Sequence, residues 1–256
     1  MASTIAKSEY DQQAVAYSKC KRAAWRTAVE MDIAQRMFRD HATPDEITYD
    51  LACGDGFYTR WLASSGLFEN IIGIDISPEM IALAKETDDA AGSIEYLCAD
   101  VHDFSCETRP LASFAFSGYL LSYASSESEL ISFLTAVRST LREGGGFCTV
   151  QNSTHDTFTE STGLEKYGIR KSKCTSGPMR EWDKIRYDFF DVDTPAATVC
   201  SITNYYVSPD TLTRCALRAG FEAPVFYPAQ SEDPHYACFI DRGCIEGVAF
   251  IAKPVR

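Results

Sequence analysis

Three short polar segments, each directly after an apolar run, carry the residues best placed for chemistry. The first is 52–56, Ala-Cys-Gly-Asp-Gly, where glycines let the backbone pass close to a ligand and begin a helix near Phe57. Asp75 ends the second run, about twenty residues after the glycine turn, and is placed to accept hydrogen bonds from both hydroxyls of a ribose. Asp100 ends the third run, where a carboxylate can accept from the exocyclic amine of an adenine and Val101 can pack against the ring.

Each of these segments also has an ordinary structural explanation when it is taken alone. A G-x-G turn can be a tight strand-to-helix connection, and Asp75 can be a turn residue that leads a helix. A dinucleotide enzyme needs the third glycine of G-x-G-x-x-G, and Thr59 stands at that position. Together, the segments offer a backbone turn for an amino-acid group, an acid for ribose and an acid for adenine, in that order. This order indicates S-adenosylmethionine (SAM) and not a pyrophosphate cofactor.

Short apolar runs that alternate with helical stretches must position these segments. The clearest helices are expected over Pro78–Glu86, which Ser77 would cap, and over Glu127–Leu141, which Arg142–Gly146 would stop. Strands alternating with helices of this length predict an α/β fold, with a parallel sheet covered by helices on both faces and ligands beyond the carboxyl ends of the strands. The runs typical of strands are Ile47–Leu51, Ile71–Ile74, Ile94–Leu97, Phe114–Phe116 and Phe147–Val150.

The chain is expected to form a single domain over residues 1–256, with an N-terminal helical cap over 8–40 and a SAM-binding core over 46–151. Regular alternation lapses after the fifth strand, so 152–207 is predicted to be an insertion that overhangs the ligand end of the sheet as a lid or substrate wall. Residues 208–256 return to the core. The elements expected in these last two parts are strands at Ile185–Phe190 and Val199–Val207, a helix over Pro209–Ala219, and strands at Phe221–Tyr227 and Gly247–Ala252.

Charge and composition limit the class of partner. The chain is 45% hydrophobic, which suits an ordinary globular core, and its net charge is −12. That acidity argues against nucleic acid or an anionic membrane as the main partner, because phosphates are held by clustered Lys and Arg. The nearest basic cluster is Lys166–Lys173, and its shortness favours a solvated loop over a phosphate site.

The ten cysteines do not indicate a metal site. They contain no C-x-x-C pair, and none has a histidine at zinc-finger spacing. No secretory signal opens the sequence, and no apolar run has the length of a membrane span. We therefore expect a cytoplasmic protein whose cysteines are reduced and mostly buried, with a redox role for one of them left open.

Four segments resemble the successive motifs of class I SAM-dependent methyltransferases: Asp50–Gly56, Gly73–Ser77, Ala99-Asp100 and Leu141–Gly145. The resemblance implies a Rossmann-like fold with a mostly parallel seven-stranded sheet. More narrowly, the chain is similar to the small-molecule branch that includes the toxoflavin-biosynthesis N-methyltransferase. That likeness lies in Tyr17 with Lys21, Arg26 and Glu30, in Tyr119–Ala124, in Lys166–Gly168 and in Asn204–Phe221.

The resemblance also implies residue roles at the cofactor. Tyr17 would lie near the transferred methyl group, and Arg26 would bind the cofactor's carboxylate, unless Arg26 is a surface residue paired with Glu30 one helical turn on. Ala52 replaces the first glycine of the commonest motif, and Ser113 stands where many relatives carry Asp. The implied contacts are Ala52, Gly54 and Gly56 to the methionine part, Asp75 and Ile76 at the ribose, Asp100 and Val101 at the adenine, and Ser117, Gly118 and Tyr119 at the sulfonium, with Met80 as a further cofactor-binding residue.

Methyl transfer from a sulfonium is an in-line displacement, so much of the catalysis can come from positioning. A neutral amine, a heteroaromatic nitrogen or a sulfur nucleophile can react without a general base. A hydroxyl acceptor usually needs one, for which His102, Asp103, His155 and His235 are sources. Tyr17, Tyr119 and His155 are the predicted catalytic residues. The predicted function is methyl transfer from SAM to a small metabolite, leaving S-adenosylhomocysteine (SAH), with a nitrogen acceptor favoured and no metal. A non-catalytic SAM-binding protein and a nicotinamide-dependent oxidoreductase are the alternatives.

Overall fold

Seven strands form the central sheet of the protein. The computed structural model describes residues 14–20, 23–43, 47–88, 94–104, 109–155, 163–190, 198–242 and 244–254. Within them the strand order is β3-β2-β1-β4-β5-β10-β9. The first five strands run parallel, and β10 is antiparallel to both of its neighbours. The strands are β1 (Thr48–Leu51), β2 (Ile71–Asp75), β3 (Ile94–Cys98), β4 (Ala112–Gly118), β5 (Leu141–Asn152), β9 (Val225–Pro228) and β10 (Ile245–Ile251). The predicted mostly parallel seven-stranded fold is confirmed.

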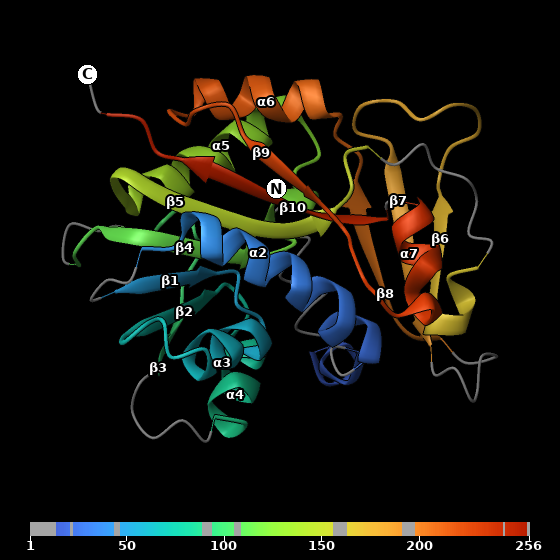
Figure 1. The fold of residues 1–256 in the computed structure, drawn as a ribbon, viewed down its shortest axis with the longest axis horizontal. Coiled ribbons are helices and arrows are strands. Elements are labelled where there is room, and N and C mark those ends of the chain that lie inside the picture. The colour runs from blue at the N-terminus through green and yellow to red at the C-terminus, as the bar shows by residue number, and fades with distance from the viewer. Residues whose placement is uncertain are drawn as a thin grey trace.

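Helices cover both faces of this sheet (Figure 1). Alternate residues of a strand point to opposite faces, so Phe114 and Phe116 pack against Phe38 on one side while Ala115 joins the core on the other. One face carries α2 (Met31–His41), α3 (Phe57–Ser64) and α4 (Pro78–Glu86), and the other carries α5 (Glu127–Ser139) and α6 (Pro209–Arg218). The two larger hydrophobic cores hold the sheet between them.

Local signals set most helix boundaries. Ser77 accepts a hydrogen bond from the Met80 N–H, with Pro78 in the first turn, as predicted for the start of α4. The predicted stop at Arg142–Gly146 is wrong in part. The helix α5 ends at Ser139, and the chain passes directly into β5 at Leu141, with an irregular register against β4 and a positive φ at Gly144.

A second, three-stranded antiparallel sheet lies beside the carboxyl ends of the core strands (Figure 1). Its strands are β6 (Ile169–Lys173), β7 (Lys184–Phe190) and β8 (Thr198–Tyr205), and all three fall within the predicted insertion. The expected strands β7 and β8 are confirmed. The solvated loop predicted at Lys166–Lys173 is wrong, because β6 pairs with β7 and alternates buried Ile169 and Lys171 with exposed Arg170.

The N-terminal segment is helical where it is described. Residues 14–20 form a helix, and Arg26–Glu30 form a π-helical turn, η1, that continues into α2. Lys21 and Cys106 lie outside the described residues, as do 8–13 of the predicted cap. Short elements complete the chain: η2 (Leu120–Tyr123), η3 (Glu165–Tyr167), η4 (Pro234–Tyr236) and α7 (Ala237–Arg242). Among the helices described here, none combines the length and apolar character that crossing a membrane requires.

Candidate functional site

The turn after β1 is built from residues in a left-handed backbone conformation. Ala52, Gly54 and Gly56 have φ of +59°, +59° and +75°. A Cβ placed on Gly54 would meet no heavy atom within 4 Å, so the turn faces open space. Thr59, which stands where a dinucleotide enzyme has glycine, donates a hydrogen bond to Asp50 at 2.6 Å and ties α3 to β1. The turn is therefore open, and a ligand can approach its backbone closely.

Asp75 connects the tips of three neighbouring strands. Its Oδ2 accepts from the Gly54 N–H at 2.8 Å, and its Oδ1 accepts from the Ser77 N–H at 2.9 Å. The Ala99 N–H, just after β3, donates to the Asp75 carbonyl at 2.9 Å. An ionised carboxylate has about four lone-pair sites, so it can accept from a ligand hydroxyl as well as from backbone donors. The geometry thus joins the ends of β1, β2 and β3 into one edge.

A cavity of about 410 Å³ opens at this edge, and we name it the cofactor cavity. Its lining includes the predicted residues Ala52, Gly54, Asp75 and Gly118, together with Tyr17 from the helix over 14–20. The remaining lining residues are Cys53, Tyr58, Leu120 and Tyr123. An open backbone turn beside a buried carboxylate fits the amino-acid and ribose parts of SAM.

The other predicted cofactor residues do not line the cofactor cavity. Met80 and Ser117 are fully buried, and the Ser117 hydroxyl bonds Thr149 at 3.2 Å. Asp100 turns back on its own loop, where it accepts from the His102 N–H at 2.9 Å. Val101 packs in the core, Ile76 is half-buried next to Asp75, and Gly56 caps α3. Their cofactor contacts remain predictions.

A second cavity of about 430 Å³, the central cavity, lies between the N-terminal segment and the second sheet. Tyr17 lines both cavities, and the neighbours Gly118 and Tyr119 line the cofactor cavity and the central cavity respectively. The described residues that complete its lining are Trp25, Arg26, Asn152, Leu164, Ile169, Tyr187, Phe189, Ile202, Asn204, Phe239, Cys244 and Ile245. The walls are mostly aromatic and aliphatic.

Glu30 is the centre of a buried polar network beneath these cavities. It is 0% exposed, it pairs with Arg26 at 2.8 Å, and it accepts from the hydroxyls of Tyr58 and Tyr119. The bulk of Tyr58 explains Gly118, since a Cβ there would lie 2.6 Å from the Tyr58 ring. The alternative of a surface Arg26 paired with Glu30 is right about the pair and wrong about its place, because both side chains are buried. Nothing in the local pattern shows that α3 and the loop after β4 bury it.

The environment sets the charge states of this network. Burial alone would lower the pKa of Arg26, but Glu30 and the phenols of Tyr119, Tyr17 and Tyr58 together outweigh it and hold that pKa above its ordinary value. Burial, together with the Glu30 charge, raises the pKa of both the Tyr58 and Tyr119 phenols. Arg26 is therefore charged and both phenols are protonated at neutral pH. Binding of the cofactor carboxylate by Arg26 stays a prediction, and in the structure this residue lines only the central cavity.

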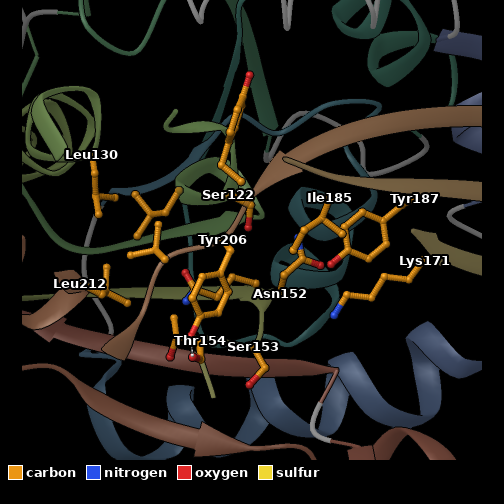
Figure 2. A pocket seen from close by; sticks show the side chains of 14 residues that line it. Ser122, Leu130, Asn152, Ser153, Thr154, Lys171, Ile185, Tyr187, Tyr206 and Leu212 are labelled. Atoms are coloured by element: carbon orange, nitrogen blue, oxygen red, sulfur yellow. Dashed lines mark hydrogen bonds between the residues drawn. The ribbon is translucent and has the colours of Figure 1, made fainter. Parts of the chain in front are cut away.

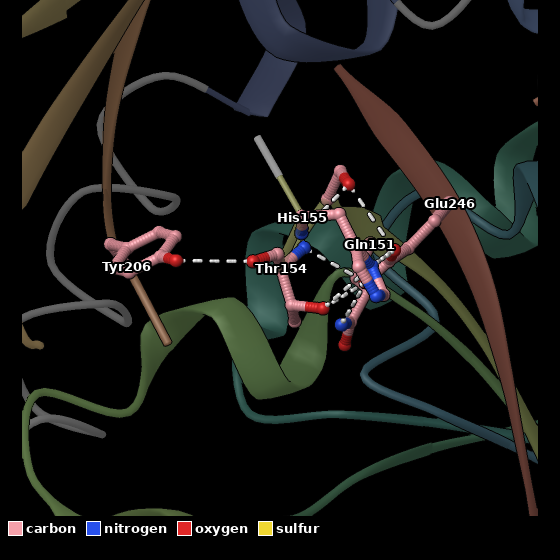
Figure 3. Close-up of polar contacts among 6 residues, drawn as sticks. Gln151, Thr154, His155, Tyr206 and Glu246 are labelled. Carbon is pink, nitrogen blue, oxygen red and sulfur yellow. Dashed lines mark hydrogen bonds and ion pairs between the residues drawn. The ribbon is translucent and has the colours of Figure 1, made fainter. Parts of the chain in front are cut away.

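His155, one of the predicted catalytic residues, contacts the carboxylate of Glu246. Its Nδ1 lies 2.9 Å from Glu246 Oε2, and its side chain is 55% exposed (Figure 3). Buried Glu246 also accepts from the Thr154 N–H and hydroxyl, both at 2.8 Å, and from Gln151 and Ser153. His155 lines neither the cofactor cavity nor the central cavity. Its catalytic role remains a prediction.

A third cavity of about 420 Å³ adjoins the central cavity, with Asn152 and Tyr187 lining both. We name it the lysine recess after Lys171, whose side chain turns into it from β6 (Figure 2). The other lining residues are Leu121, Ser122, Leu130, Gln151, Ser153, Thr154, Ile185, Tyr205, Tyr206, Val207 and Leu212. No local pattern in the sequence predicts this recess, because its walls come from segments far apart in the chain.

The eight cysteines whose state the structure describes are all free thiols, and five of them are buried. This agrees with the expected reduced, mostly buried state for those residues. Cys20 and Cys200 approach each other, with 3.6 Å between their sulfur atoms. Across the described residues, no group of three or more His, Cys, Asp or Glu side chains is placed to hold a metal ion.

Comparisons with known proteins agree with this fold. Residues 49–145 match the model of a family described as a methyltransferase domain, and no curated protein matches the sequence. A methyltransferase in complex with the Haloferax volcanii Trm112 activator is 14% identical, with a TM-score of 0.63 over 98% of both chains. The sugar N-methyltransferase KedS8 of Streptoalloteichus is 17% identical, with a TM-score of 0.61 over 91% of this chain and 90% of that one. The DhpI–SAM–HEP complex is 18% identical, with a TM-score of 0.61 over 97% and 95%.

Proposed function

We propose that this chain, a SAM-dependent methyltransferase by its domain at residues 49–145 and by its fold, methylates a small molecule held in the central cavity. The observation that carries the proposal is the boundary between the two cavities. Tyr17 lines both cavities, whereas the consecutive residues Gly118 and Tyr119 line the cofactor cavity and the central cavity respectively. A methyl group at this boundary would leave the cofactor on one side and meet its acceptor on the other.

When bound, SAM supplies an electrophilic methyl group, and the residues of this chain supply position. The turn at Ala52 and Gly54 would hold the amino-acid part, and Asp75 would hold the ribose. Tyr119 is fixed by its bond to Glu30 and keeps its proton, so it serves as a wall and not as a base. Alignment of the reacting atoms is the main catalytic effect in such a site.

The chemistry of the walls favours a small acceptor. Trp25, Phe189, Ile202 and Phe239 provide an enclosed apolar surface, which suits a compact molecule better than a polymer. A nitrogen acceptor is favoured, with sulfur or oxygen as alternatives, because a neutral amine or heteroaromatic nitrogen needs no base and no described histidine lines this cavity. KedS8, which has a similar fold, is a sugar N-methyltransferase, and this supports the same preference. The proposal also includes membership of the small-molecule branch near the toxoflavin-biosynthesis N-methyltransferase, a cytoplasmic location and catalysis without a metal.

Calorimetry with SAM and SAH tests the cofactor site directly. We expect both to bind the wild type, and we expect Asp75→Ala to weaken both by at least about 10-fold, because the ribose and the Gly54 N–H each lose an acceptor. Glu79→Ala, an exposed acid in the first turn of α4, is the matched control and should bind normally. No heat with either ligand would contradict the proposal.

The acceptor is then sought with methyl-labelled SAM. The protein is incubated with a fractionated metabolite extract, and labelled products are identified by mass spectrometry. A labelled small molecule formed by the wild type and not by Asp75→Ala would support the proposal. Label found in protein or nucleic acid, and in no small molecule, would contradict it.

A further inference from the structure

Two cysteines that are 180 residues apart in the chain meet between the N-terminal helix and the second sheet. Cys20 is the last described residue of the helix over 14–20, and Cys200 lies on β8. Their sulfur atoms are 3.6 Å apart, with a hydrogen bond between the two thiols. The sulfur atoms of a disulfide are about 2 Å apart, so a closer approach of about 1.5 Å completes the bond. The two thiols are therefore close enough to be oxidised to a disulfide.

The cysteine pair belongs to a packed contact between the helix and the sheet. Tyr17 meets Phe189 on β7 edge-on, with 6.4 Å between the ring centres. Residues three positions apart share one face of a helix, so Tyr17 and Cys20 both face the second sheet. Phe189 and Cys200 are directly opposite each other in the pairing of β7 with β8. The ring contact and the sulfur contact therefore lie side by side, and together they hold the helix against this sheet.

The two thiols differ in exposure and in their electrostatic surroundings. Cys20 is half-buried, whereas Cys200 is only 3% exposed. The hydrogen bond from Cys200 and the positive charge of Arg26 lower the pKa of the Cys20 thiol, and the same hydrogen bond together with burial raises the pKa of the Cys200 thiol. The Arg26 Nε also donates to the Cys20 carbonyl at 3.4 Å. Since the thiolate is the reactive form of cysteine, Cys20 is the thiol that an oxidant reaches and attacks first.

We propose that Cys20 and Cys200 are a redox-active pair, which hydrogen peroxide oxidises to a disulfide that ties the helix over 14–20 to the second sheet. The Cys20 thiolate attacks one peroxide oxygen, the O–O bond breaks, and the sulfur becomes a sulfenic acid while hydroxide leaves and takes up a proton. The Cys200 sulfur then attacks the Cys20 sulfur, and the S–O bond breaks. The thiol proton leaves with the oxygen as water. Two thiols and one peroxide thus give one disulfide and two molecules of water.

The disulfide would fix a wall that the two cavities share. Tyr17 lines both the cofactor cavity and the central cavity, and a covalent bond at Cys20 would keep the helix that carries it against the second sheet. Resting on the proposed function, oxidation therefore slows the entry of SAM and the release of SAH. Where thiols are kept reduced, a disulfide of this kind is transient, so the pair acts as a reversible switch.

Peptide mapping tests the pair itself. The reduced protein is treated with increasing amounts of hydrogen peroxide, its remaining thiols are blocked with N-ethylmaleimide, and its peptides are analysed by mass spectrometry without reduction. We expect the peptides of Cys20 and Cys200 to be the first to become linked, and dithiothreitol to separate them. Cys174→Ser, which removes an exposed thiol, is the matched control and should form the same link. A different disulfide formed first, or none, would overturn the proposal.

Single variants test the order of the two steps. In Cys200→Ser, peroxide should leave Cys20 as a sulfenic acid that dimedone labels. In Cys20→Ser, dimedone should label Cys200 far less, because its thiol is buried and protonated. Stronger labelling of Cys200 than of Cys20 in these variants would overturn the assignment of Cys20 as the attacking thiol.

The release of SAH tests the consequence for the cavities. SAH is bound before oxidation, and its dissociation is followed by stopped flow. We expect oxidation to slow release at least about 10-fold, because the helix must move for the ligand to leave, and dithiothreitol to restore the rate. In Cys200→Ser, peroxide should leave the rate unchanged. Unchanged release from the oxidised wild type would overturn the switch. Absence of SAH binding to the reduced protein would contradict the proposed function itself, while the linked peptides would still decide the redox pair.

Discussion

The cofactor cavity and the lysine recess are built in opposite ways. The cofactor cavity relies on backbone: a turn through Gly54 with positive φ, and a carboxylate at Asp75 that itself accepts backbone N–H groups. The recess relies on buried side chains, with Lys171 and Tyr187 projecting from the second sheet. A backbone site depends on conformation at a few adjacent residues, whereas a side-chain site depends on packing between distant segments.

This difference predicts where substitutions act. Changes at the backbone site should alter ligand affinity more than stability, because the fold around β1 and β2 is held by other contacts. Changes among the buried polar side chains should alter stability strongly, since each uncompensated charge in the interior carries a large free-energy cost.

The largest effect is expected from Glu30→Ala. It would leave Arg26 as an unpaired buried charge and remove the acceptor of Tyr58 and Tyr119. Breaking a buried pair typically costs about 3–5 kcal/mol of unfolding free energy, which urea denaturation can measure. Glu127→Ala, which breaks an exposed pair with Arg214 and Arg218, is the control and should change stability far less. Equal effects of the two variants would refute the claim.

The second-largest effect is expected at Lys171, where removal of the charge should raise stability instead of lowering it. Burial lowers the pKa of Lys171 to about 8 from an ordinary value of 10.5, with Tyr187 and Cys244 facing it from the neighbouring elements. Between these two pH values the unfolded chain binds more protons than the folded one, so the stability of the wild type rises with pH there. Below pH 8 the cost of the buried charge is fully present, on the order of 3 kcal/mol at 1.36 kcal/mol per pKa unit.

Lys171→Met should therefore be more stable than the wild type at pH 7 when no acceptor is bound. That advantage should fade as the pH approaches 10.5, and urea denaturation at several pH values measures it. A less stable variant at pH 7 would show that Lys171 is structural.

Gly54→Ala tests the backbone site. The added Cβ would project into open space beside the turn, and we expect SAM affinity to fall at least about 10-fold. The left-handed φ of Gly54 disfavours alanine, and this strain should lower stability by about 1 kcal/mol. Gly66→Ala is a matched control, because Gly66 has φ of +68° and also has nothing within 4 Å of its Cβ position, but it lies in an exposed turn. Equal SAM affinity in the two variants would show that Gly54 does not contact the cofactor.

The smallest effect is expected from Ala52→Gly. Ala52 holds φ of +59°, which costs an L-residue about 1–2 kcal/mol, and glycine removes most of this strain at some cost in unfolded-chain entropy. We expect a net gain of roughly 0.5 kcal/mol in thermal or chemical unfolding. Ala63→Gly, inside α3, should instead lose stability. A loss in Ala52→Gly as well would mean that the turn is not strained.

Local signals made much of the fold and the cofactor edge predictable. The core strands, the start of α4 and the cluster of Gly54 with Asp75 all follow from patterns within a few residues. Strand β6 was missed because Ile-Arg-Lys-Ser-Lys has one apolar residue, and Lys171 becomes buried only through its pairing with β7 and the cavity beside it. The Glu30 network was missed for the same reason, since Tyr58 and Tyr119 reach it from separate segments.

The helix over residues 14–20 forms a wall of both the cofactor cavity and the central cavity through Tyr17. Ser18 on this helix donates to Asp55 in the glycine turn at 2.6 Å, which holds the wall against the core. If this helix moved away from the core, both cavities would open together. SAM binding and SAH release would then depend on the same movement. Motions of this kind limit the turnover of many enzymes.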